Sequence, residues 1–161
     1  ITFNKMGYLV DNAQSGDNLP MKPIIQKAIL SAKVIRKDIH FETNLEDISF
    51  HGEEEPWRIV VENLLDNALR YAKTKIKITL DEEGLFVFND GPLLEKERLD
   101  KLFKPYEMGS GGRFGLGLSI VKRVTETYGY RVLGENMNDG VIFKVLKPKN
   151  KRFLRKEVKD D

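Results

Sequence analysis

Apolar and polar positions recur along this chain with two different periods, and each period predicts one kind of element. The clearest pattern runs over Trp57–Ala72, where apolar residues return every three or four positions, which predicts an amphipathic helix. The same period predicts helices over Lys22–Arg36 and from Gly115 to near Gly129, and a short helix fits Glu95–Phe103.

Strict or partial alternation of apolar and polar residues predicts strands between these helices. The expected strands are Ile39–Glu42, Ile48–Phe50, Lys75–Leu80, Leu85–Phe88, Tyr130–Glu135 and Val141–Leu146. Turn residues join the third to the fourth and the fifth to the sixth, so two hairpins are expected. Helices thus alternate with antiparallel pairs, which predicts an α+β fold: a two-layer α/β sandwich with a mixed, mostly antiparallel sheet and helices on one face.

The chain of 161 residues is long enough for one domain with a real core. We place that domain at residues 20–148, after a linker or N-terminal segment at 1–19. Residues 149–161 are strongly charged and offer few apolar side chains, so we expect a frayed, flexible tail.

Composition narrows the classes of function. Hydrophobic residues make up 40% and charged residues 32%, as in a globular protein, and the net charge of +2 gives no case for nucleic-acid or membrane-surface binding. Without cysteine there are no disulfides or thiolate metal sites, and no apolar run approaches the roughly 20 residues of a membrane span. No signal peptide is visible, and the chain begins at Ile1 rather than Met, as an excised piece of a longer protein would.

The Trp57–Ala72 helix carries a second pattern on its polar side. Asn63, Asn67 and Arg70 are spaced by four and then three, so they form one polar stripe. Asn is a mediocre helix former, so two of them one turn apart suggest a working surface, although a solvated face remains the alternative.

Two further features interrupt the regular elements. Asn89-Asp90-Gly91-Pro92 ends a strand abruptly, and the glycine-rich stretch Gly109–Gly117 runs into a helix. Glycines let backbone N–H groups approach an anion, and a helix start adds unpaired donors and a positive dipole end. Arg113 would add positive charge. Taken alone, the loop is weak evidence for phosphate binding, since it matches neither a Walker loop nor a dinucleotide fingerprint.

Together, the three features resemble the ATP-binding domain of bacterial sensor histidine kinases, in the superfamily that includes DNA gyrase and MutL. Three segments carry the resemblance: Asn63–Tyr71 is similar to the family's N box, Leu102–Tyr106 to its F box, and Gly115–Lys122 to its second glycine box. The likeness covers roughly residues 20–148. It implies a Bergerat-type fold that binds ATP and Mg²⁺.

The resemblance also implies roles for the polar stripe. Asn67 would be the Mg²⁺ ligand, and Asn63 would hold the same Mg²⁺–phosphate unit. Arg70 would pair with the phosphates, and Tyr71 would lie against the adenine. Asn63 and Arg70 are the expected catalytic residues.

A mobile lid over Gly109–Phe114 is implied as well, with Phe103 anchoring its near end. Gly115 and Gly117 would let the backbone wrap the phosphates. The remaining nucleotide-site residues implied by the resemblance are Leu94, Arg113, Phe114, Leu116 and Leu118.

One motif departs from the family pattern. The first glycine box reads Asp-x-Gly-x-Gly, and its Asp accepts a hydrogen bond from the adenine amino group. Here the register aligns Asn89 with that Asp, while Gly91 matches and Leu93 replaces the second glycine. Asn accepts through its amide oxygen but more weakly; a one-residue slip would present Asp90 instead. We expect Asn89, with lowered adenine affinity.

The chemistry at position 63 favours transfer over hydrolysis. Superfamily ATPases carry a Glu there to activate water, whereas the Asn63 amide is no base and Glu62 points about 100° away around the helix. The nucleophile implied by the family is a histidine on a separate helical hairpin. His40 and His51 lie in a strand and a turn, so we assign both structural roles.

The expected partners are therefore ATP, an upstream phosphoacceptor and dimerisation hairpin of the same protein and, indirectly, a response regulator. We expect a monomeric, cytoplasmic domain of a membrane-anchored bacterial sensor, with no direct membrane contact. Two alternatives stay open: a non-catalytic adaptor of the same fold, and an anti-sigma-type protein serine kinase.

Overall fold

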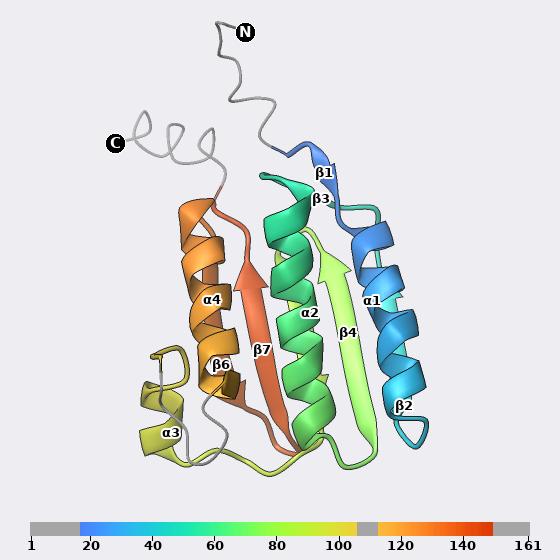
Figure 1. Cartoon of the computed structure of the whole chain (residues 1–161), viewed down its shortest axis with the longest axis vertical. Coiled ribbons are helices and arrows are strands. Elements are labelled where there is room, and N and C mark those ends of the chain that lie inside the picture. The colour runs from blue at the N-terminus through green and yellow to red at the C-terminus, as the bar shows by residue number, and fades with distance from the viewer. Residues whose placement is uncertain (1–16, 106–112, 150–161) are drawn as a thin grey trace, which may run out of the picture.

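Three helices lie side by side on one face of a five-stranded sheet, so the domain has two layers (Figure 1). The computed structural model describes residues 17–105 and 113–149, and for residues 113–116 it describes the backbone alone. The three helices are α1 (Lys22–Ile35), α2 (Glu54–Tyr71) and α4 (Arg113–Thr127), with α2 in the middle.

The sheet is mixed but mostly antiparallel. Its strands, in spatial order, are β2 (His40–Leu45), β4 (Lys75–Asp81), β5 (Gly84–Asn89), β7 (Val141–Leu146) and β6 (Arg131–Asn136). Only β2 and β4 pair in parallel, and the other neighbours are antiparallel. The short helix α3 (Lys96–Asp100) lies beyond β5 in the chain. The predicted fold class is confirmed.

The core lies between the helices and the sheet, because both carry their apolar residues there. Along β4, Ile76, Ile78 and Leu80 are buried while Lys77 between them is exposed. The central helix α2 buries one continuous stripe: Trp57, Val60, Val61, Leu64, Leu65, Ala68 and Leu69. The polar stripe of α2 is thus held on a helix fixed along its whole length.

Some boundaries differ from the sequence prediction. The strand expected at Ile39–Glu42 runs on to Leu45, because parallel pairing with β4 continues through Leu45 and Leu80 although the sequence stops alternating. The segment expected to be a linker ends in a short strand, β1 (Leu19–Pro20), which pairs with β3 (Ser49–Phe50). The domain therefore begins earlier than residue 20.

Other expectations fall outside the described residues. These are the character of residues 1–16 and of the tail from residue 150 onward. Within the described part of the chain, every helix is too short or too polar to cross a membrane.

Candidate functional site

The two asparagines of α2 are half-buried, and Asn63 faces the neighbouring helix α4. The amide nitrogen of Asn63 donates to the carbonyl of Ile59, one turn earlier, at 2.8 Å. Its amide oxygen lies toward α4, since a Cβ on Gly117 would come within 2.7 Å of it. A residue without a side chain at position 117 thus lets α4 approach Asn63 closely.

Asn67 holds an acceptor without a partner. Its amide oxygen is buried, yet within the described residues it receives no hydrogen bond. A buried polar group left unpaired costs about 1–3 kcal/mol, so such groups are rare in folded proteins. An amide oxygen is also a suitable ligand for the hard cation Mg²⁺. Asn67 therefore fits the metal that the resemblance implies.

The last turn of α2 carries Arg70 and Tyr71. The Arg70 guanidinium lies 3.5 Å from the carboxylate of Asp66, one turn earlier. Such a surface ion pair contributes at most about 1 kcal/mol. The Tyr71 ring is exposed, with 37% of its surface open to solvent. A cation and an aromatic ring thus stand together at the end of the helix that holds both asparagines.

The end of β5 lies beside this last turn. Asn89 is the final residue of β5, is only 2% exposed, and pairs with Ile76 on one side and Val141 on the other. Its side-chain oxygen accepts the N–H of Gly91 at 2.8 Å. A Cβ on Gly91 would collide with the carbonyl oxygen of Tyr71, so the strand end packs directly against the helix end.

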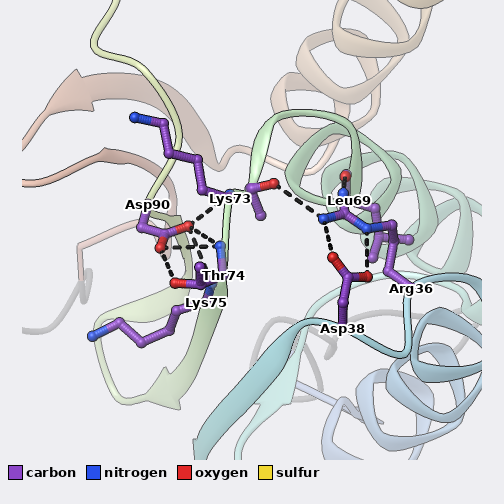
Figure 2. A network of polar contacts seen from close by, with 8 residues as sticks. Arg36, Asp38, Leu69, Lys73, Thr74, Lys75 and Asp90 are labelled. Atoms are coloured by element: carbon purple, nitrogen blue, oxygen red, sulfur yellow. Dashed lines mark hydrogen bonds and ion pairs between the residues drawn. The ribbon is translucent and has the colours of Figure 1, made fainter.

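Asp90 points the other way and is fully engaged in the fold. Its carboxylate accepts the backbone N–H groups of Lys73, Thr74 and Lys75 and the Thr74 hydroxyl (Figure 2). Partial burial acts to raise the pKa of Asp90, but the hydrogen bonds from these residues outweigh it and hold the pKa well below its usual range.

A third group of predicted residues lies between α3 and β6. The backbone N–H and carbonyl of Leu94 are both bonded by the side chain of Asn136, at 2.9 and 2.8 Å. The Phe103 ring packs edge-on against Phe143 at 6.2 Å between centroids. The sequence did not indicate this role for Asn136, because Asn is common near hairpin turns.

The glycine-rich stretch differs from expectation at its end. The helix begins at Arg113, two residues before the predicted start at Gly115, so Gly115 and Gly117 both lie within its first two turns. Leu118 is buried in the core. The lid over residues 109–112 and the side chains of Arg113, Phe114 and Leu116 lie outside the described residues.

The two histidines make their described contacts with residues other than the asparagines of α2. His40 stands on the edge strand β2 with its ring 3.6 Å from the carboxylate of Glu42. The backbone N–H of His51 donates to the Tyr130 hydroxyl, and its carbonyl accepts from the Trp57 ring nitrogen at 2.9 Å. Both histidines thus make contacts that belong to the fold.

Known proteins are similar to this chain in sequence and in fold. Residues 52–151 match the family of histidine kinase-, DNA gyrase B-, and HSP90-like ATPases. Over 152 residues the chain is 35% identical to sensor histidine kinase CssS of Bacillus subtilis, covering 91% of this chain and 34% of that protein. Over 150 residues it is 28% identical to sensor protein QseC of Escherichia coli K12, covering 87% and 33%. The chain thus spans about a third of these relatives.

Among solved structures, the catalytic domain of histidine kinase ThkA, in a nucleotide-free form, superposes with a TM-score of 0.73 at 30% identity. The match covers 81% of this chain and 95% of that domain. A structure of ThkA in complex with the response regulator protein TrrA matches with a TM-score of 0.68 at 28% identity, covering 83% and 42%.

Proposed function

This chain belongs to the histidine kinase-, DNA gyrase B- and HSP90-like ATPase family, and we propose that it binds ATP with Mg²⁺ and donates the γ-phosphoryl group to a histidine on another domain. The observation that carries the proposal is the buried, unpaired amide oxygen of Asn67, one turn after Asn63, which faces the close approach of α4 at Gly117. Such an acceptor is stabilised once a cation takes it as a ligand.

Different residues around Asn67 would bind Mg²⁺ and the phosphates. Asn67 and Asn63 would hold Mg²⁺, which supplies charge neutralisation for the phosphates when bound. Arg70 exchanges its weak pairing with Asp66 for the charge-assisted hydrogen bonds that a phosphate offers. The first turn of α4 would add backbone N–H groups, which have no partner inside a helix at its start.

The base would lie at the joint between α2 and β5. Tyr71 offers an exposed ring for stacking. Asp90 has its carboxylate engaged by residues 73–75, which supports Asn89 as the acceptor for the adenine amino group. The Asn89 oxygen already accepts from Gly91, so it offers its second lone pair, and we propose that adenine binds weakly as a result.

Transfer, and not hydrolysis, fits the groups around position 63. The Asn63 amide takes up no proton, and its nitrogen is held by Ile59. Glu62 is exposed and lies 3.9 Å from Arg58, in the groove between α1 and α2. In transfer, a neutral imidazole nitrogen attacks the γ-phosphorus, the bond to the bridging oxygen breaks, and ADP leaves with the electron pair. The enzyme then needs mainly to position and neutralise charge.

We also propose where this domain works. The accepting histidine would belong to an upstream helical dimerisation domain of the same protein, and the phosphoryl group would pass on to a response regulator. The full protein would be a membrane-anchored bacterial sensor with this domain in the cytoplasm.

A mixing experiment tests the transfer. The domain is incubated with γ-labelled Mg-ATP and the separately produced upstream helical hairpin of its parent protein. We expect acid-labile, alkali-stable label on the hairpin, lost when its histidine is replaced by Gln. Label that is acid-stable would instead indicate a serine kinase, and nucleotide binding without transfer would indicate an adaptor.

A further inference from the structure

The turn that joins α2 to β4, residues 72–75, is held from two sides by charged side chains (Figure 2). Arg36, just after α1, lies on one side, and Asp90, just after β5, lies on the other. Both residues bond backbone groups of α2 or of this turn, and each also has a side-chain partner, Asp38 for Arg36 and the Thr74 hydroxyl for Asp90. We call Arg36, its partner Asp38 and Asp90 the turn brace.

Arg36 satisfies the end of α2. The last carbonyls of a helix have no partner inside the helix. The Arg36 guanidinium donates to the carbonyl of Leu69 at 2.7 Å and to that of Ala72 at 3.4 Å. Its remaining donors meet the Asp38 carboxylate at 2.9 and 2.8 Å, a two-bond pairing that fixes the plane of the guanidinium.

Asp90 satisfies the start of β4. Three successive backbone N–H groups, from Lys73 to Lys75, converge on its carboxylate. The N–H of Asp90 itself donates to the Lys75 carbonyl at 3.2 Å. The turn is therefore tied to the residue that directly follows Asn89.

The brace connects two parts of the proposed site that come from distant parts of the chain. Arg70 and Tyr71 lie between the two carbonyls that Arg36 binds. Asn89 precedes the carboxylate that binds the turn. The spacing between the tyrosine ring and the Asn89 amide thus depends on contacts at both ends of the same turn.

We propose that Arg36 and Asp90 are positioning residues that hold the adenine-binding half of the site at the spacing a nucleotide requires. This inference rests on the proposed function. It does not extend to the metal, because Asn67 lies one turn before Tyr71 on α2 and takes part in none of the contacts described for Arg36 and Asp90.

Calorimetry at a temperature where every variant is folded separates these roles. Dissociation constants are measured for ADP without Mg²⁺ and for Mg-ATP, in the wild type and in Arg36→Met. We expect both constants to rise by about tenfold, as is usual when a supporting residue behind a site is lost, with their ratio unchanged. Asp90→Asn should give the same pattern, and Asp38→Asn a smaller rise of about threefold, since the carbonyl bonds of Arg36 remain.

Arg58→Met is the matched control. Arg58 is also an ion-paired arginine, 2.7 Å from Glu55, but it lines the groove between α1 and α2. We expect unchanged binding. A residue that only stabilises the fold would lower the melting temperature and leave both constants unaltered, so that result for Arg36→Met and Asp90→Asn would overturn the brace. If the wild type itself binds no nucleotide, the proposed function falls, and the brace with it.

Discussion

Replacing Asn67 with Ala should make the domain more stable while removing its response to magnesium. The buried oxygen of Asn67 has no hydrogen bond in the described structure, so its removal relieves a penalty of about 1 kcal/mol or more. Ala also gains up to about 0.7 kcal/mol of helix propensity over Asn. Both effects make the variant more stable, whereas a substitution at a half-buried position usually makes a protein less stable.

The lost packing of the single amide carbon offsets part of this gain, by about 0.8 kcal/mol, the value for one methylene-sized group. We therefore expect Asn67→Ala to raise the free energy of unfolding by about 1 kcal/mol, measured by urea titration without nucleotide or metal. For a domain of this size, that gain raises the melting temperature by roughly 4 °C.

Asn63→Ala is the control for this prediction. The amide nitrogen of Asn63 does have a partner, the Ile59 carbonyl, so its removal loses one hydrogen bond and no comparable gain in stability is expected. In calorimetry, Asn67→Ala should bind nucleotide equally with and without Mg²⁺, whereas Asn67→Asp keeps an oxygen ligand and the Mg²⁺ dependence. A less stable Asn67→Ala, or one that keeps the full effect of Mg²⁺, would refute the metal assignment.

Three further substitutions test other parts of the structure. Gly91→Ala would place a Cβ against the Tyr71 carbonyl, so we expect a loss of about 2 kcal/mol in unfolding free energy, and an unchanged urea midpoint would contradict that contact. The lowered pKa of Asp90 means that its carboxylate stabilises the fold above its ordinary pKa of 3.8 and stops doing so as the pH falls through the folded-state value. Asp90→Asn should thus be less stable than the wild type at neutral pH, with the gap closing on acidification; a gap independent of pH would count against these hydrogen bonds. Trp57→Ala leaves a cavity at a fully buried position, so we expect the free energy of unfolding, measured by urea titration, to fall by about 4 kcal/mol. A loss under about 1 kcal/mol would contradict the packing of Trp57 in the core.

The sequence predicted the regular elements well wherever the apolar period was long. Over Trp57–Ala72 the apolar stripe is the one that the structure buries. The strand ends were less predictable, because β2 continues to Leu45 through pairing with β4, a contact that local alternation does not reveal. The short strand at Leu19 was missed for the same reason, since the strand that it pairs with lies far along the chain, at Ser49–Phe50.

The residues of the candidate site were also only partly predictable from the sequence. The polar stripe was visible because Asn63 and Asn67 lie one turn apart on one helix. The supporting residues were not visible, because Arg36 reaches α2 across more than thirty residues of sequence and Asn136 reaches Leu94 across more than forty. Asp90 was considered only as a base contact, and its bonds to residues 73–75 depend on how β5 meets β4.

Direct binding of nucleotide to the isolated domain is the most immediate test of the central claim. Titration of the wild-type domain with Mg-ATP in a calorimeter should give saturable binding of one nucleotide with a dissociation constant below about 1 mM, weakened when Mg²⁺ is removed. No heat of binding at millimolar Mg-ATP, from a domain shown to be folded, would contradict the account.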